Sequence, residues 1–359
     1  MRPVPSLLAA LLVLLTLACA QQTAPAAPGV AGGSPATAPT APPAASASSP
    51  TGLPAPVAMR FGLNSPTAYV TPAWVAKDEG FFAKYGIDAE LVVMQSSAQL
   101  APALMSGEIP ITLSAATGIV NATLGGSDLV LLGGYSNQLR FWFYARPEID
   151  SVPALRGKQI AITRRGGGVH QATELALRRN GLDPDRDVTL IQVGSTNDSL
   201  TAMLSGAVAA GMLSPPGMFR ADDQGLHLLV DTGDYRYPFI LQGIATSRSW
   251  LAQNEDLARR TLQALGEGLA FAHQHKERTK EIIGQYTRVD DPTLLEKTYT
   301  TLVPGFERTL YAPPEALRPD LEALAEEIPA ARDARPEQFL DTRLVDELDR
   351  SGFFQRLYQ

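Results

Sequence analysis

The sequence predicts an α/β protein made of two similar lobes, and three observations support this. Short apolar runs alternate with longer helical patterns from residue 59 onward, as is typical of strands joined by crossover helices. A series of strands and turn residues recurs roughly 95 to 100 residues later in the chain. Two further strand-like segments flank the second copy, as expected for a chain that crosses into a second lobe and returns.

The strands are predicted from apolar runs bounded by glycine, serine and asparagine. They are expected at residues 59–62, 89–94, 109–113, 129–133, 139–145, 159–163, 188–192, 207–213, 226–230 and 239–246. The alternation with helices favours a parallel sheet. Beyond Ser249 the pattern is mainly helical.

The internal repeat is carried by turn residues. Each copy starts with a glycine, an apolar residue and an aspartate, and continues through a strand, a hydroxyl-bearing turn, a helix ending in Ser-Gly and a strand ending in serine. The matched segments are 86–88 and 181–183, 96–97 and 195–196, 103–107 and 202–206, and Ser114 and Ser214. Any two α/β units look alike at this level, so the order of the glycines and serines carries the prediction of two lobes.

The flanking strands divide the chain into lobes. Residues 57–146 together with 239–359 are predicted to form lobe one, and residues 147–238 lobe two. Two crossing strands would join the lobes as a hinge. A cleft that closes on a ligand is a common function of such hinges.

Residues 1–19 have the features of an export signal. Arg2 precedes an apolar run over 7–17, which is short for a membrane span. Cys19, the chain's single cysteine, follows Leu17 and Ala18 as in a lipobox, which predicts lipidation, although Thr16 replaces the leucine expected there. Ordinary cleavage at the Ala18-Cys19-Ala20 triplet is the alternative. Residues 20–56 are rich in Ala, Pro and Ser and predict a disordered tether.

Composition excludes some classes of partner. The chain has 359 residues, a net charge of −7, 45% hydrophobic and 19% charged residues. It is long enough for two lobes, and it lacks the basic field that nucleic-acid binding requires. We therefore expect a soluble folded part and no nucleic-acid partner.

A ligand site is expected where the predicted strands end, because helices begin there and their free N–H groups point outward. Polar or aromatic residues gather at these turns in both lobes. The candidates are Asn64, Ser65, Tyr69, Ser96, Ser114, Thr117, Tyr135, Thr196 and Ser214. Each could equally be a helix cap, so the convergence of the turns carries the prediction.

A glycine-rich turn is the sharpest candidate. Arg164 and Arg165 precede Gly166, Gly167, Gly168, Val169 and His170. Consecutive glycines before a helix expose backbone N–H groups to an anion, and Arg164 could pair with a carboxylate or sulfonate. The spacing satisfies neither a Walker loop nor a dinucleotide-binding motif, and a flexible turn is the alternative interpretation.

Catalytic patterns are missing from the sequence. The histidines at 170, 227, 273 and 275 lack metal-ligand spacing, and Gly134-Tyr135-Ser136-Asn137-Gln138 lacks the final glycine of a nucleophile elbow. We expect no enzyme activity, no cofactor and no metal site.

The segment 74–88, with Gly80-Phe81-Phe82 and Gly86-Ile87, resembles the periplasmic solute-binding proteins of the nitrate, sulfonate, taurine and thiamine-pyrimidine type. The segments 104–107, 155–158, the Ser-Pro-Pro turn at Ser214 and the ending 341–354 are similar too. The resemblance implies a type II periplasmic-binding fold with a ligand between the lobes. It adds Ala115 to the contacts expected at Ser114, Thr117, residues 166–170 and Ser214.

The resemblance also implies a role in transport. We expect the substrate-binding component of an ABC importer, a monomer exported and lipid-anchored at Cys19 on the outer face of the cytoplasmic membrane or in the periplasm, that delivers a sulfonate, nitrate, carboxylate or pyrimidine-like solute to a permease. An iron-dependent pyrimidine-synthase-like enzyme and a tethered ligand sensor are the alternatives on the same fold.

Overall fold

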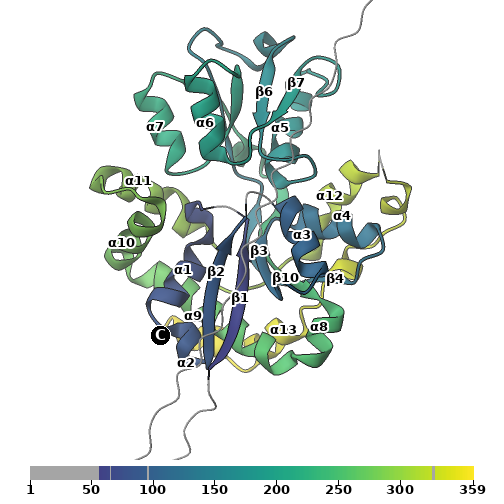
Figure 1. The fold of residues 1–359 in the computed structure, drawn as a ribbon, viewed down its shortest axis with the longest axis vertical. Helices are drawn as coiled ribbons and strands as arrows, with labels where there is room; N and C mark the ends of the chain where they lie inside the picture. The colour runs from purple at the N-terminus through teal and green to yellow at the C-terminus, as the bar shows by residue number, and fades with distance from the viewer. Residues whose placement is uncertain (1–55, 65, 95–96, 326–327) are drawn as a thin grey trace, which may run out of the picture. The chain divides into compact units, whose positions relative to one another are not determined.

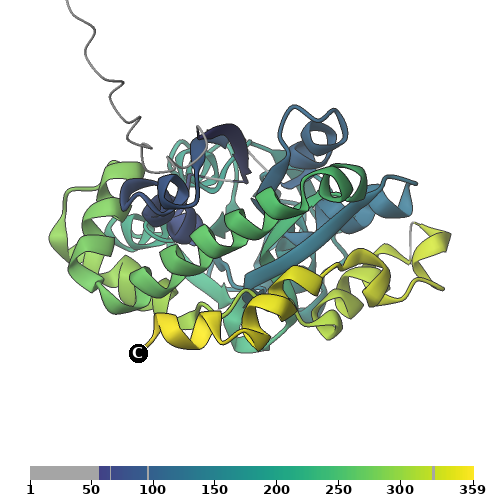
Figure 2. The same cartoon turned by 90° about the horizontal axis from the view of Figure 1, so that it is seen from below.

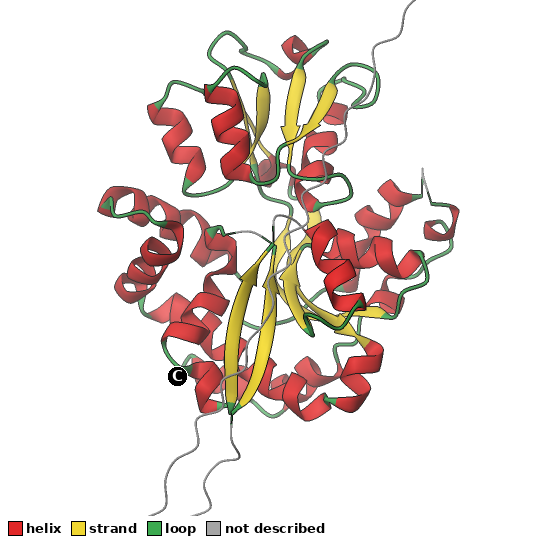
Figure 3. Cartoon of the chain, viewed as in Figure 1, coloured by secondary structure: helices red, strands yellow, loops and turns green. Residues whose placement is uncertain are grey.

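The computed structural model describes residues 56–64, 66–94, 97–325 and 328–359. The predicted export signal with Cys19, the tether as far as residue 55, and the candidates Ser65 and Ser96 lie outside the described residues. In the described part the prediction of an α/β fold is confirmed. The strands form two five-stranded sheets, and helices pack around each (Figure 1, Figure 3).

The first sheet has the strand order β2-β1-β3-β10-β4. Its strands are β1 (Val57–Leu63), β2 (Ile87–Val93), β3 (Ile111–Ser114), β4 (Leu129–Gln138) and β10 (Pro238–Ser247). Strand β1 is parallel to β2 and β3, whereas β10 is antiparallel to β3 and β4.

The second sheet has the strand order β7-β6-β8-β5-β9. Its strands are β5 (Trp142–Ala145), β6 (Gln159–Ile162), β7 (Thr189–Gln192), β8 (Ala210–Leu213) and β9 (His227–Asp231). Strand β6 is parallel to β7 and β8, whereas β5 is antiparallel to β8 and β9.

The two sheets repeat one arrangement, as the internal repeat predicts. In each sheet the fourth strand, β10 or β5, enters directly from a strand of the other sheet and runs antiparallel to its neighbours. Both sheets are therefore mixed, and the predicted parallel sheet is wrong in this respect. Strand β5 belongs to the second sheet, so the predicted lobe boundary at residue 146 falls too late.

The two crossing segments are hydrogen-bonded to each other. The Leu139 N–H donates to the Tyr237 carbonyl at 3.2 Å, and the Thr232 N–H donates to the Phe141 carbonyl at 2.9 Å. The Thr232 hydroxyl, which is fully buried, accepts the Phe141 N–H at 2.8 Å. These bonds satisfy backbone groups that leave one sheet before they reach the next.

The helices follow the strands in both lobes. Their bounds are α1 (Thr71–Asp78), α2 (Phe81–Lys84), α3 (Ser97–Met105), α4 (Ala116–Leu124), α5 (Gly168–Arg179), α6 (Thr196–Leu204), α7 (Gly217–Asp223), α8 (Arg248–Gln253), α9 (Glu255–Gln274), α10 (Lys276–Thr287), α11 (Pro292–Leu302), α12 (Arg318–Leu324), α13 (Arg343–Arg350) and α14 (Phe353–Leu357). The predicted helical pattern after Ser249 is confirmed.

The C-terminal segment returns to the first sheet. The Gly134 N–H donates to the Leu310 carbonyl at 2.9 Å, and the Asp341 N–H donates to the Leu131 carbonyl at 2.8 Å. Figure 2 shows this segment, in yellow, running beside the sheet. The bonds join it to the edge strand β4, so α12 and α13 are held against the first sheet.

The segment that carries the family resemblance is a packing element. Phe82 is buried against Phe61 of β1, with ring centroids 4.7 Å apart. Gly80 and Gly86 adopt φ angles of +74° and +68°, which favour glycine. Trp74 stacks on Tyr286 of α10 at 4.8 Å. These contacts hold α2 against β1 and α1 against α10, and none of them involves a residue predicted to bind the ligand.

Close packing of α1 on α9 gives a testable prediction. A Cβ placed on Gly268 would lie 2.3 Å from the Pro72 carbonyl oxygen, so Gly268→Ala must push the helices apart. We expect this variant to lose about 1–3 kcal/mol of unfolding free energy, as overpacked cores do, measured by urea denaturation. Gly305→Ala is the control, because a Cβ there meets nothing within 4 Å. Equal stability of the two variants would contradict the prediction.

Candidate functional site

Two helices begin at the candidate site without a side-chain cap. Helix α4 follows β3 with Ala115 at the N-cap, and α5 follows β6 with Gly167 at the N-cap. Neither N-cap residue has a side chain that accepts a hydrogen bond from the N–H groups of the first turn. The N–H groups of a first helical turn have no partner within the helix, and the helix dipole makes them favourable neighbours of an anion.

The two helix starts meet across the lobes. A Cβ on Gly168 would lie 3.1 Å from the Ala115 Cβ, which is closer than ordinary van der Waals contact, and 3.6 Å from the Phe239 ring. Gly166 has a φ of +71°, which turns the chain into α5. The predicted glycine-rich turn therefore serves two purposes: it allows the backbone turn and it lets α5 approach α4.

Three polar side chains join the lobes beside this contact. The Thr117 hydroxyl of α4 lies 2.9 Å from Gln171 Oε1 of α5 and 3.1 Å from Asp320 Oδ1 of α12. All three residues are buried. Burial raises the pKa of Asp320 to about 7, although the neighbouring side chains of Gln171 and Thr117 act in the opposite direction.

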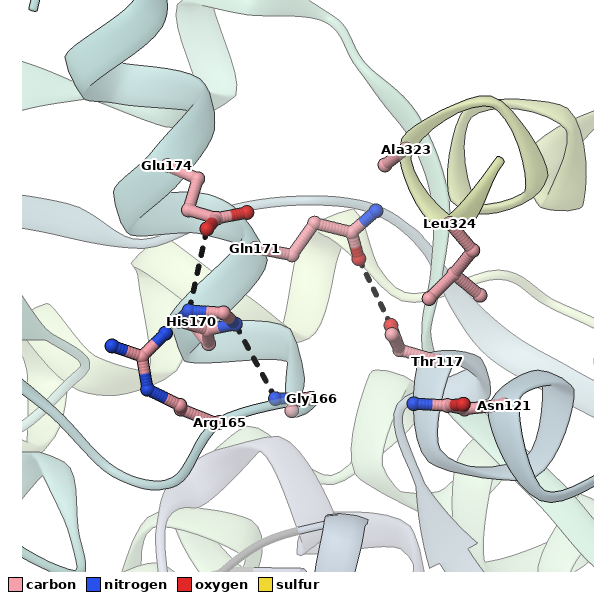
Figure 4. A pocket seen from close by; sticks show the side chains of 10 residues that line it. Thr117, Asn121, Arg165, Gly166, His170, Gln171, Glu174, Ala323 and Leu324 are labelled. Carbon is pink, nitrogen blue, oxygen red and sulfur yellow. Dashed lines mark hydrogen bonds and ion pairs between the residues drawn. The ribbon is translucent and has the colours of Figure 1, made fainter. Parts of the chain in front are cut away.

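A cavity of about 290 Å³ opens beside these helix starts. Its walls come from α4, from the glycine-rich turn and α5, and from α12 (Figure 4). The lining residues are Thr117, Asn121, Arg165, Gly166, Gly167, His170, Gln171, Glu174, Ala323 and Leu324. The predicted Thr117, Gly166, Gly167 and His170 are brought together here.

His170 holds the glycine-rich turn in place. Its Nδ1 accepts the Gly166 N–H at 3.3 Å, and its Nε2 lies 3.4 Å from Glu174 Oε1. Burial lowers the pKa of His170 to about 4, and the Arg165 guanidinium acts in the same direction. The ring is therefore neutral near pH 7, with its proton on the nitrogen that faces Glu174.

The predicted tyrosines lie in the core. The Tyr69 hydroxyl donates to the Arg140 carbonyl, and the Tyr135 hydroxyl donates to the Tyr69 carbonyl at 3.0 Å. The prediction that Tyr135 lies in a turn after the fourth strand is wrong, because pairing with β10 extends β4 as far as Gln138. Both hydroxyls are occupied within the protein.

The remaining candidates lie on several elements. Thr196 and Ser214 are buried and hydrogen-bond to each other at 3.1 Å, while Ser195 caps α6 in a capping box with Asp198. Asn64 Oδ1 accepts from Gln242 at 3.5 Å. The positions of the others are as follows: Ser114 is fully buried at the end of β3, Val169 is buried at the start of α5, and Arg164 is exposed.

The sequence interpretation missed the far wall of the cavity. Asn121 lies one helical turn after Thr117, and Gln171 and Glu174 continue α5 beyond His170. These could have been found from helical spacing. Ala323 and Leu324 of α12, and the buried Asp320 next to them, come from a segment with no signal in the sequence that links it to the glycine-rich turn.

Solved structures of similar fold include periplasmic solute-binding proteins. The alkanesulfonate-binding protein SsuA from Xanthomonas axonopodis pv. citri, bound to MOPS, matches with a TM-score of 0.66 and 17% identity over 82% of this chain and 98% of that one. The periplasmic nitrate-binding protein NrtA from Synechocystis PCC 6803 matches with a TM-score of 0.67 and 15% identity, covering 82% and 89%. The chain thus has the fold of these periplasmic binding proteins.

The sequence comparisons give the family. The family model described as NMT1/THI5 like matches residues 67–279, and the chain belongs to this family. The riboflavin-binding protein RibY of Chloroflexus aurantiacus is 28% identical over 237 residues, which cover 62% of this chain and 66% of RibY.

The described residues contain neither a helix that could span a membrane nor a cluster of metal ligands. None of their helices is both long and apolar enough to pass through a bilayer. Nor do three or more His, Cys, Asp or Glu side chains of the described part gather as a metal site would require.

The neutral His170 gives a prediction for pH. An unfolded histidine has a pKa near 6.5, so between about pH 6.5 and 4 the unfolded chain binds a proton that the folded chain does not. This contribution to stability is complete above pH 6.5 and is lost as the pH falls. We expect His170→Gln to remove about 1–2 kcal/mol of the loss that the wild type shows between pH 7 and 5.

Urea denaturation at the two pH values measures this difference. His227→Gln is the matched control, because His227 is exposed. If His170→Gln and His227→Gln keep the same pH dependence as the wild type, His170 is not held neutral by its surroundings.

Proposed function

We propose that the protein captures a small anionic or polar organic solute between its lobes and delivers it to an ABC permease. The observation that carries the proposal is the approach of two uncapped helix starts, at Ala115 and Gly168, from opposite lobes. An anion at this point would receive N–H groups from both lobes at once, so its binding would favour closure.

The neighbouring side chains extend the proposal to an organic solute. Asn121, Gln171 and Arg165 offer hydrogen-bond donors in the cavity, and Ala323 and Leu324 supply apolar contact. Relatives bind an alkanesulfonate, nitrate and riboflavin. The candidate solutes are therefore a sulfonate, nitrate, a carboxylate, or a pyrimidine-like or larger heteroaromatic compound. The ligand-binding set would centre on Ser114, Ala115, Thr117 and residues 166–170.

A thermal-shift screen tests the proposal. We expect one class among an alkanesulfonate, nitrate, a short carboxylate, a pyrimidine and riboflavin to raise the Tm saturably, because a solute that binds only the folded state adds about 2.7 kcal/mol at one hundred times its Kd. If none of these compounds shifts the Tm, the proposed solute class is wrong.

A variant at the lobe contact tests the position of the site. Gly168→Leu would place a side chain against Ala115 and Phe239 and keep the helix starts apart. We expect it to weaken binding of the solute found in the screen at least tenfold, by isothermal titration calorimetry at a temperature where circular dichroism shows the free variant to be folded. Gly305→Leu, at an open surface position, should bind as the wild type does. Unchanged affinity in Gly168→Leu would place the site elsewhere.

Membrane attachment forms a separate part of the proposal. We infer that the chain is exported, lipidated at Cys19 and held as a monomer near its permease. Cys19→Ser is expected to move the protein from the membrane fraction to the soluble fraction, as measured by fractionation and by the mass of the purified chain. An unmodified wild-type chain in the soluble fraction would favour ordinary signal cleavage.

A further inference from the structure

A buried carboxyl group touches the contact between the lobes. Asp320 of α12 is fully buried, and it lies on the first-lobe side of a cluster whose other members are Thr117 of α4 and Gln171 of α5. Gln171 is the second-lobe member, and it is 8% exposed. The hydroxyl of Thr117 is thus shared by a group of its own lobe and a group of the other lobe.

The number of protons in this cluster determines which bonds can form. Thr117 has one hydroxyl proton, but its oxygen lies 2.9 Å from Gln171 Oε1 and 3.1 Å from Asp320 Oδ1. A protonated Asp320 can donate to Thr117, which then donates to Gln171, so every contact is a hydrogen bond. An ionised Asp320 can only accept, so it competes with Gln171 for the single Thr117 proton.

Two buried polar atoms of the cluster also favour a protonated Asp320. Among the described residues, Asp320 Oδ2 and Gln171 Nε2 are both buried without a hydrogen-bond partner. An ionised carboxylate with an unpaired buried oxygen is costly, whereas a neutral carboxyl group is much less so. Burial accordingly raises the pKa of Asp320 to about 7.

The charged surroundings of Asp320 come from few elements. Helix α4 and strand β10 carry no titratable side chain. The other neighbouring elements carry both signs of charge. These groups are His170, Glu174, Arg178 and Arg179 of α5, Arg318 and Glu322 of α12 itself, Glu315 of the 3-10 helix η5 (Pro314–Leu317), and Tyr237, which precedes β10. Burial raises the pKa of Tyr237, and the nearby Asp320 and Glu322 carboxylates raise it further.

We propose that Asp320, Thr117 and Gln171 form a proton-dependent latch between the lobes. When Asp320 is protonated, the chain of donors runs through Thr117 to Gln171 and holds α5 against α4. When Asp320 is ionised, Thr117 turns its proton to the carboxylate, and the bond that it donates to Gln171 Oε1 across the lobes is lost. The latch rests on the proposed function in one respect: the same contact between the lobes would close over a solute.

The latch is tested without any solute, by energy transfer between dyes on the two lobes. The exposed residues Met105 of α3 and Leu204 of α6 are replaced by cysteine and labelled, in the full chain carrying Cys19→Ser. We expect the transfer efficiency to be constant below about pH 6, and to change to the value of an open form as the pH rises past about 7, where Asp320 loses its proton.

Variants separate the latch from a general effect of pH. Asp320→Asn keeps the shape and supplies an N–H donor to Thr117 at every pH, so its transfer efficiency should stay at the low-pH value. Gln171→Leu removes the second-lobe acceptor and should show the open value at every pH. Glu322→Gln, an exposed change on the same helix, should follow the wild type. Far-UV circular dichroism checks that each variant is folded.

Three results would overturn the latch: a wild-type transfer efficiency that does not change with pH, an Asp320→Asn profile equal to that of the wild type, or a Gln171→Leu protein that keeps the closed value at low pH. Because no solute is present, these results are independent of the thermal-shift screen. If the screen finds no binding compound, the proposed solute class is wrong, but the outcome of the latch measurement is not affected.

Discussion

The arrangement of both lobes depends on the hydrogen bonds between the two crossing segments. The chain leaves each sheet once, and its backbone groups must find partners on the way. Thr232 meets this requirement from the second crossing, because its N–H and hydroxyl both bond to Phe141 of the first. Since the antiparallel strands β5 and β10 start from these segments, the position of one sheet's fourth strand is tied to that of the other.

The helix starts differ in a way that bears on function. Helix α6 is closed by the Ser195 capping box, so its first amides already have an acceptor. Helices α4 and α5 begin at Ala115 and Gly167 without such a cap. The first amides of α6 thus have an acceptor within the protein, whereas those of α4 and α5 are available to an acceptor from outside, such as an anion. Among these three helix starts, this difference makes α4 and α5 the places to seek an anion.

Much of the fold could be predicted from the sequence, for a local reason. Strands are short apolar runs, and the glycines and serines between them mark turns. These local signals do not depend on the rest of the fold, so the elements and their repeat could be predicted. The end of β4 was not, because its continuation through Tyr135 depends on pairing with β10. The boundary near residue 146 failed for a similar reason, since the aromatic run of β5 fits either sheet equally well by its pattern.

Part of the candidate site could also be predicted from the sequence, and part could not. The glycine-rich turn could be predicted because three adjacent glycines have few other uses, and the structure brings Gly166 and Gly167 to a cavity with Thr117. Helix α12 could not, because Asp320 and Thr117 are 203 residues apart and no pattern connects them. The segment around Phe82 carries the family resemblance but does not indicate which solute binds, because its side chains pack in the core.

The C-terminal return of the chain places a functional wall on a segment that belongs to neither sheet. Helix α12 is held to the first lobe through the edge of β4, and its side chains meet α5 from outside the strand ends. Amino-acid changes along this helix can accumulate in evolution without disturbing the amides at Ala115 or Gly168. Changes at Asp320, which does not line the cavity, would alter the contact between the lobes, whereas changes at Ala323 or Leu324 would alter the wall that a solute meets.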